Sequence, residues 1–305
     1  MNLVNLPAHN FTRRLIACLG LFLIALTAAM PVAAADRTEK LLIGVEPEHN
    51  IFDQMEQYRY LAGYLSDQLG ITVQFTIMSR YGEVIKRFKT LKLDGAVLTA
   101  YTTAMGIKEL DLEPIANPVN LNGESTSQGY IFVRKDSGIR NVKDMQGKSI
   151  IFVDQATMEG YLFPLAYLRR QGVTDFNKFF NRFSSSGSHA SAIFAVLDGR
   201  ADIGAAKNTA LNKLALHDPS IQQELNILAQ SPKVPEFTLC IKNDIDQNLQ
   251  ARLAAVLFQM DKTSLGQKVL KKFKALRFVK ANKADFARIE EMAREARSAI
   301  AEHGK

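Results

Sequence analysis

The sequence has few of the residues that build disulfides and metal sites. It contains two cysteines, and one of them, Cys18, lies in an N-terminal segment that we expect to be removed. With Cys240 alone remaining, an internal disulfide and a cysteine-rich metal site are both excluded. The five histidines are scattered along the chain and suggest no metal site either.

Common catalytic patterns are also missing. There is no Gly-x-Ser-x-Gly turn, no glycine-rich phosphate loop ending in Lys-Ser or Lys-Thr, and no His-Glu-x-x-His. Cys240 lies inside the apolar segment Phe237–Ile241, where a packing role is more common than that of a nucleophile. These absences favour a binding protein over an enzyme, and we expect no bound cofactor.

An apolar stretch near the N-terminus has the features of a secretory signal. Arg13 and Arg14 precede the apolar run Leu15–Thr27, and Pro31–Ala35 ends in a small-x-small pattern. This order predicts a signal peptide over residues 1–35, cleaved near Ala35. An uncleaved anchor is the alternative, but the run is too short for a membrane-spanning helix.

Positive charge exceeds negative charge, and much of the excess is local. Loss of Arg13 and Arg14 with the signal lowers the formal net charge from +7 to +5. The C-terminal excess consists of Lys262, Lys268, Lys271, Lys272, Lys274, Arg277, Lys280 and Lys283. Such a stretch can bind nucleic acid, but a secreted chain rarely meets any. We therefore expect a solvated helix face and no nucleic-acid partner.

Strand-like and helix-like segments alternate from residue 41 onward. This alternation predicts an α/β fold with mainly parallel sheets. The mature chain is too long for one ordinary core, which favours two lobes. We predict a first lobe from residues 36–128 plus 236–305 and a second lobe from residues 129–235.

Two strands should connect these lobes. Gly129–Arg134 would leave the first lobe and Glu236–Ile241 would return to it, which makes a two-strand hinge. The remaining residues, Leu249–His303, are predicted to be helical and to pack on the first lobe.

The segment Val153–Pro164 predicts a buried strand, a polar turn and then a helix. The N–H groups at a helix N-terminus are unpaired and carry partial positive charge, which favours an anion. Thr157 and the backbone N–H groups of Met158, Glu159 and Gly160 are therefore the first candidates for ligand contacts. Thr157 could equally be only an N-cap.

Five motifs share their order and spacing with one family. They are Tyr81–Ile85, Tyr101, Val142–Lys148, Gly160–Pro164 and Gly187–His189. Together they resemble the periplasmic substrate-binding proteins of phosphate, phosphite and phosphonate ABC transporters. The resemblance implies a two-lobed type II periplasmic binding protein fold with the ligand in the interlobe cleft. It also implies an ABC permease in the inner membrane as partner. The predicted signal peptide leads us to expect a periplasmic location, and we expect a monomer.

The resemblance implies roles for several residues. The histidine that matches His189 contacts the oxyanion, and Ser188 beside it is a flexible donor. Tyr101 and Tyr81 match aromatic residues of the first lobe that face the ligand. The family usually carries Ser-Thr-Ser-Gly where this chain has Thr157-Met158-Glu159-Gly160. Glu159 either faces outward, where the helix dipole favours an acid, or faces the cleft. In the cleft it would repel a phosphonate, and it would favour an amine or require a protonated ligand oxygen.

Four further residues are weaker candidates. Glu46 follows the first strand, and Arg80 adjoins Tyr81, where it could clamp a carboxylate or phosphonate. Thr99 precedes Tyr101 and could cap its helix. Lys207 follows a strand, at a position where the resembled family often has an acidic residue that binds the ligand's amine. This chain has a positive charge there instead. If Glu46 and Glu159 bind an amine of the ligand while Arg80 and Lys207 bind an acidic group, the ligand is zwitterionic.

We therefore expect a periplasmic protein that captures a small phosphonate-like anionic or zwitterionic solute for uptake. One alternative is a ligand sensor for a membrane signalling partner. The other is an enzyme that uses Glu159 as a base of raised pKa near His189.

Overall fold

A computed structural model describes residues 40–48 and 50–301 of the chain. The signal peptide predicted for residues 1–35, with its cleavage near Ala35, lies outside the described residues. In the described part of the chain, no helix combines the length and the apolar character that crossing a membrane requires.

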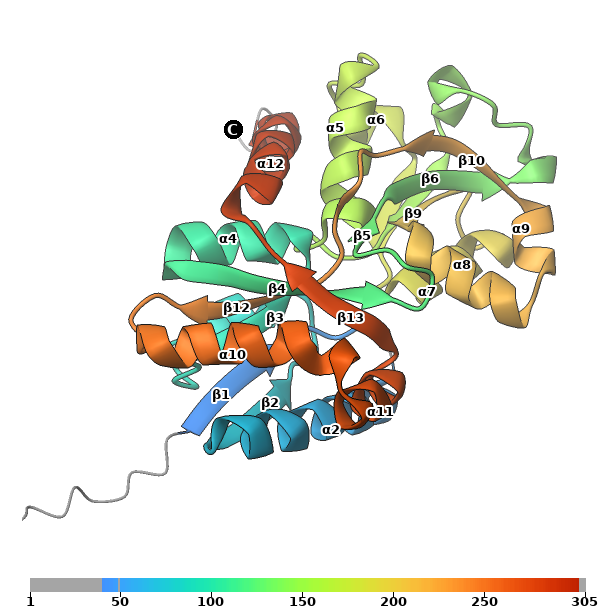
Figure 1. The fold of residues 1–305 in the computed structure, drawn as a ribbon. Helices are drawn as coiled ribbons and strands as arrows, with labels where there is room; N and C mark the ends of the chain where they lie inside the picture. The colour runs from blue at the N-terminus through green and yellow to red at the C-terminus, as the bar shows by residue number, and fades with distance from the viewer. Residues whose placement is uncertain (1–39, 49, 302–305) are drawn as a thin grey trace, which may run out of the picture. The chain divides into compact units, whose positions relative to one another are not determined.

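The first sheet has six strands in the order β13-β4-β12-β3-β1-β2. Their bounds are β1 Lys40–Val45, β2 Thr72–Ile77, β3 Gly95–Leu98, β4 Leu112–Asn120, β12 Thr238–Lys242 and β13 Ala275–Lys280. Strand β1 is parallel to its neighbours β2 and β3, whereas β12 and β13 are antiparallel to their neighbours. Figure 1 shows α2, α10 and α11 around this sheet.

The second sheet has five strands in the order β10-β6-β9-β7-β8. Their bounds are β6 Gly129–Arg134, β7 Ser149–Phe152, β8 Arg182–Ser185, β9 Ile203–Lys207 and β10 Leu225–Gln230. Strand β7 is parallel to β8 and β9, while β6 is antiparallel to β9 and β10. Both sheets are thus mixed, and the expectation of mainly parallel sheets is wrong, because the strands that join the two sheets run against their neighbours.

The helices follow the strands of each sheet. With the first sheet come α2 Ile51–Leu69, α3 Glu83–Arg87, α4 Ala100–Leu110, α10 Gln247–Gln259 and α11 Ser264–Phe273. With the second come α5 Phe163–Arg170, α6 Phe176–Phe179, α7 His189–Leu197, α8 Asn208–His217 and α9 Ser220–Glu224. Single turns occupy Lys135–Ser137, Val142–Met145, Met260–Lys262 and Lys283–Phe286, and α12 covers Ala287–Ala301.

Local sequence explains where some of these helices begin and end. The side chain of Asn50 accepts the N–H of Phe52 at the start of α2, and Gly70, with φ of 69°, ends this helix. Polar N-caps satisfy the first N–H groups, and glycine enters the left-handed region at little cost. Lys274 ends α11 with φ of 62°, and β13 follows it. The prediction of helix throughout Leu249–His303 is therefore wrong at β13.

The last helix joins two parts of the core. Ile289 and Met292 of α12, with Phe286 just before it, lie in one apolar cluster with Tyr101 of α4 and Leu168 of α5. Helix α12 therefore packs on a helix of the second sheet as well as on the first. The prediction that the C-terminal helices pack on the first lobe is incomplete, because α12 has two apolar partners.

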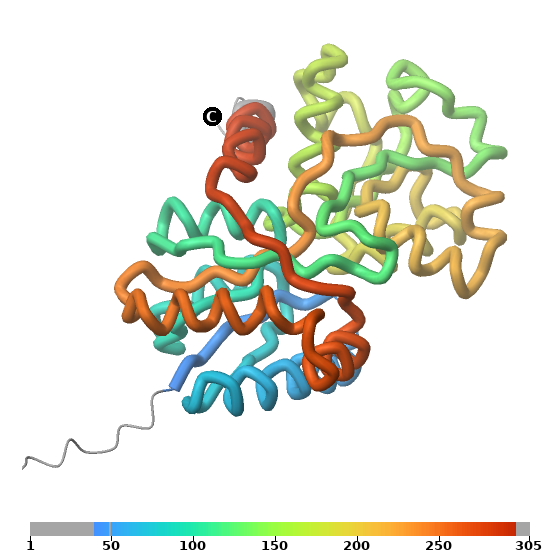
Figure 2. Tube along the Cα trace, viewed as in Figure 1, coloured from blue at the N-terminus to red at the C-terminus, as the bar shows by residue number. Residues whose placement is uncertain are grey.

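The chain passes between the sheets in two neighbouring segments. Strand β5, Thr126–Ser127, pairs antiparallel with β11, Val234–Pro235. Figure 2 traces these two crossings, one in green after β4 and one in orange before β12. Further hydrogen bonds connect them: the N–H of Gly129 donates to the Ser231 hydroxyl at 2.8 Å, and the Gln128 side chain donates to the Ser231 carbonyl at 2.7 Å.

Candidate functional site

A buried carboxylate connects the first strand to two helix starts. Glu46 is 1% exposed and follows β1. It accepts the N–H of Gly82 at 2.8 Å, the N–H of Thr99 at 2.9 Å, and the hydroxyls of Thr99 and Thr102 at 3.0 and 2.5 Å. Burial raises the pKa of Glu46, and the hydrogen bonds from Thr102, Thr99 and Gly82 oppose that rise.

The Glu46 carboxylate lies at the N-terminus of α4, where a negative charge is favoured. The hydroxyl of Thr99 makes no cap bond to its own helix and donates to Glu46 instead. The sequence suggested that Thr99 could cap the helix and donate a hydrogen bond to a ligand. In this structure its hydroxyl donates to the Glu46 carboxylate.

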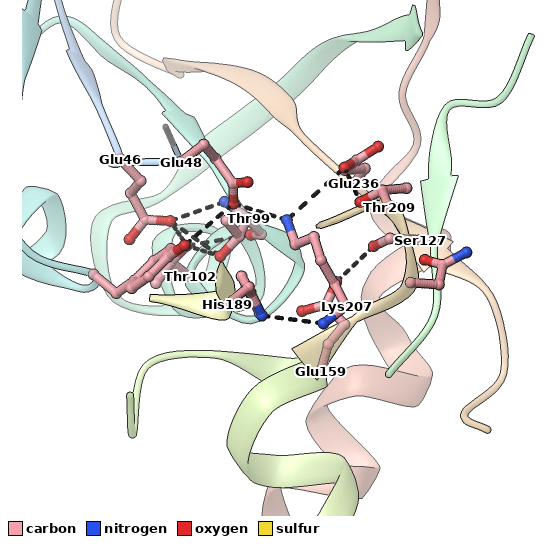
Figure 3. Close-up of polar contacts among 12 residues, drawn as sticks. Glu46, Glu48, Thr99, Thr102, Ser127, Glu159, His189, Lys207, Thr209 and Glu236 are labelled. Atoms are coloured by element: carbon pink, nitrogen blue, oxygen red, sulfur yellow. Dashed lines mark hydrogen bonds and ion pairs between the residues drawn. The ribbon is translucent and has the colours of Figure 1, made fainter. Parts of the chain in front are cut away.

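A buried ion pair connects residues of the two sheets (Figure 3). The ammonium of Lys207, at the end of β9, lies 2.7 Å from a carboxylate oxygen of Glu48 and 4.0 Å from one of Glu236. The side chain of Lys207 is 1% exposed and that of Glu48 is 6% exposed. Burial alone would lower the pKa of Lys207, but Glu48, Glu159 and Glu236 outweigh it and raise that pKa. Lys207 therefore stays charged at neutral pH.

Glu159 points inward and binds the crossing segment. It is 1% exposed, and its carboxylate accepts the hydroxyl of Ser127, in β5, at 2.6 Å. Of the two orientations left open by the sequence, the structure therefore has the inward one. Gly129 follows two residues after Ser127, and a Cβ there would lie 2.9 Å from the carbonyl oxygen of Glu159. This crossing thus needs glycine at position 129.

His189 has one satisfied and one free ring nitrogen. Its Nδ1 accepts the backbone N–H of Lys207 at 3.0 Å, so Nε2 carries the proton of the neutral ring. The residue is only 4% exposed, so solvent does not reach the Nε2 atom, and Nε2 has no hydrogen-bond partner in the protein. Burial, with the nearby Lys207 charge, lowers the pKa of His189 well below its usual value. His189 therefore presents a neutral, unpaired N–H donor.

The helix after β7 begins unusually. Met158–Leu162 forms one π-helical turn that continues into α5. The hydroxyl of Thr157 donates to the carbonyl of Asp154 at 2.6 Å and makes no cap bond, so the N-cap interpretation of its side chain is wrong. The Met158 side chain is fully buried in the apolar core. A Cβ at Gly160 would lie 2.4 Å from a Val153 methyl, so glycine is required for close packing.

Of the remaining candidates, the structure brings Tyr81 to His189 and Glu48 and leaves the others in different roles. Tyr81 and His189 lie edge to face with ring centroids 6.0 Å apart, and the Tyr81 hydroxyl donates to Glu48 at 3.5 Å. Tyr101 is 8% exposed and packs in the core beside α12. Ser188 caps α7 by accepting the N–H of Ser191 at 3.1 Å. Arg80 is exposed, so the structure does not bring it to this cluster as a clamp.

Sequence reasoning missed five of the residues that make the polar contacts labelled in Figure 3, namely Glu48, Thr102, Ser127, Thr209 and Glu236. The hydroxyl of Thr209 donates to Glu236 at 2.6 Å. Glu48 stands two residues after Glu46, and Glu236 opens the predicted return strand, so both were near positions already considered. In the described residues, no group of three or more His, Cys, Asp or Glu side chains is arranged to hold a metal ion.

Comparison with known proteins identifies the family. The model of the family described as "ABC transporter, phosphonate, periplasmic substrate-binding protein" matches residues 43–286. The chain belongs to this family. Its members are the solute-binding components of ABC importers, and the resemblance inferred from the sequence motifs is confirmed.

Individual relatives agree with this assignment. The chain is 26% identical over 222 residues to a phosphate-import protein PhnD of Mycolicibacterium smegmatis, covering 69% of each chain. A binding protein component of an ABC phosphonate transporter from Pseudomonas aeruginosa has a TM-score of 0.75 at 19% identity, covering 88% of this chain and 90% of that one. PhnD1 of Prochlorococcus marinus, solved with methylphosphonate, has a TM-score of 0.71 at 20% identity, covering 86% and 100%. The predicted type II periplasmic binding protein fold is thus confirmed.

Proposed function

We propose that this chain captures a small phosphonate-like oxyanion in the periplasm and delivers it to an ABC permease in the inner membrane. The free donor of His189 carries the proposal. A buried N–H group without an acceptor costs free energy, and an oxyanion would satisfy it. The unpaired N–H groups at the start of the Met158–Leu162 turn would be further donors.

We propose that two lobes close on the ligand. Residues 36–128 with 236–305 would form one lobe and residues 129–235 the other. The ligand would bind where His189 and the Met158–Leu162 turn of the second lobe meet Tyr81 of the first lobe. Motion about the crossings at β5 and β11 would open this site.

We further propose that the protein binds as a monomer and releases its ligand unchanged. Family membership supports a carrier role, because the related proteins are transport components. Phosphorus NMR of methylphosphonate recovered after prolonged incubation would test this point. A new phosphorus resonance that appears only with folded protein would instead indicate an enzyme.

Calorimetric titration of the chain from Asp36 onward tests ligand capture. Methylphosphonate, phosphite and phosphate are the probes, and His189→Asn is the key variant. Asparagine can still accept the N–H of Lys207 but lacks the Nε2 donor. A hydrogen bond to a charged group contributes about 1.5–3 kcal/mol, so affinity should fall about 10- to 150-fold.

Ser191→Ala is the matched control. Ser191 is an exposed residue of α7, two positions from His189, and its loss should leave affinity unchanged. The proposal fails if the unaltered chain binds none of the three oxyanions. It fails equally if His189→Asn binds them as tightly as the Ser191→Ala control.

A further inference from the structure

The side chain of Lys207 ends among groups of the kind that bind an ammonium ion. Its Nζ is 2.7 Å from Glu48 and 4.0 Å from Glu236, and it lies 4.7 Å from the centroid of the Phe237 ring. Carboxylates and an aromatic face are the groups that recognise alkylammonium ions. The chain thus binds its own ammonium as it would bind a foreign one.

The charge balance shows why this position needs a cation. The side chains of Glu48 and Glu236, 6% and 13% exposed, lie beside Nζ, and Glu159 is close enough to raise the Lys207 pKa. Burial raises the pKa of Glu236, and Lys207 is the main opposing influence. A cluster of buried carboxylates without a cation is strongly destabilising. Figure 3 shows Lys207 reaching between Glu48 and Glu236, with Glu159 beside its stem.

The ammonium environment and the free donor of His189 belong to the same site. The backbone N–H of Lys207 donates to Nδ1 of His189 at 3.0 Å. Tyr81 contacts both halves, since its ring packs against His189 and its hydroxyl donates to Glu48. A ligand held by His189 Nε2 therefore lies next to a subsite that is already filled.

We propose that Lys207 determines specificity: its ammonium occupies an alkylammonium subsite and thereby excludes ligands that carry an amine. The site then selects amine-free oxyanions over aminoalkyl oxyanions, because a second ammonium would meet a like charge and no free carboxylate. The claim that the site selects among oxyanions rests on the proposed function. The existence of an alkylammonium subsite does not, because an amine that carries no oxyanion can test it.

The first test is chemical rescue of Lys207→Ala, with Lys233→Ala as the matched control. Lys233 also pairs with a glutamate, Glu124 at 2.8 Å, but its side chain is 57% exposed. Melting midpoints are measured with propylammonium chloride and with sodium chloride at equal ionic strength. Propylammonium should raise the midpoint of Lys207→Ala by at least about 2–4 °C. The unaltered chain and Lys233→Ala should show no difference between the two salts.

A second variant keeps the test decisive if Lys207→Ala does not fold. Lys207→Ala/Glu48→Gln removes one buried carboxylate together with the ammonium, so less uncompensated charge remains. Propylammonium should still stabilise it through Glu159, Glu236 and Phe237. Equal responses to propylammonium in the unaltered chain and in the folded variant would overturn the subsite.

The second test compares methylphosphonate with 2-aminoethylphosphonate by titration calorimetry. The unaltered chain should bind methylphosphonate at least about tenfold more tightly, and Lys207→Ala should reduce or reverse that ratio. Equal binding of both compounds by the unaltered chain overturns the inference. If neither phosphonate binds any variant, the proposed function fails, while the propylammonium comparison still decides whether the subsite exists.

Discussion

Replacing Glu46 by alanine should weaken the fold because one carboxylate serves three segments. Truncation leaves the N–H groups of Gly82 and Thr99 without their acceptor. The hydroxyl of Thr102 keeps two other partners, the Thr99 hydroxyl at 3.1 Å and the Thr99 carbonyl at 3.2 Å. The magnitude therefore rests on two buried backbone donors.

Each unsatisfied buried donor costs about 1–3 kcal/mol, so the two together cost about 2–6 kcal/mol. Removal of a carboxylate whose pKa is raised by burial returns part of this energy. We expect a net loss of about 2–4 kcal/mol in the free energy of unfolding. That corresponds to a fall of about 4–16 °C in the melting midpoint of a domain of this size.

Urea unfolding followed by circular dichroism measures this loss. Glu83→Ala is the control, because Glu83 also receives an N–H and a hydroxyl, both from Ser79, but its side chain is 23% exposed. The control should lose less than about 1 kcal/mol. Added acetate should restore part of the stability of Glu46→Ala by returning a carboxylate to the same donors. Equal losses for the two variants would refute the anchoring role of Glu46.

Three further measurements test the packing and the charge states. Gly160→Ala should destabilise the chain by about 1–3 kcal/mol in urea unfolding, because its Cβ would lie 2.4 Å from Val153, and unchanged stability would contradict this packing. Burial raises the pKa of the fully buried Cys240 thiol, so a thiol reagent should react only in urea, and fast labelling of folded protein would contradict its burial. The folded pKa of His189 is lowered, so its contribution to stability is complete above pH 6.5 and falls with pH below that, by up to about 1.4 kcal/mol per unit. The stability difference between the unaltered chain and His189→Asn should therefore shrink below pH 6.5, and a constant difference would show that the His189 pKa is not lowered.

Local patterns were enough for the fold class and for most elements. The alternation of apolar and polar residues in Ile71–Ile77 predicts a strand, and the glycine at position 70 predicts a helix end. Both depend only on residues close together in the chain. Strand β13 was missed because it is short, charged and placed between two helices. Its strand conformation comes from pairing with β4, which is about 160 residues earlier in the chain.

The sequence alone determined the class of fold, the family and the residue types near the start of the Met158–Leu162 turn, because these depend on short-range periodicity and local motifs. Only the tertiary structure decided which charges meet. Glu48 and Lys207 are 159 residues apart in the chain, yet their charged atoms lie 2.7 Å apart. Arg80, equally charged and adjacent to a candidate residue, remains exposed. Burial and pairing of a charge depend on how distant segments pack, and no local pattern records that.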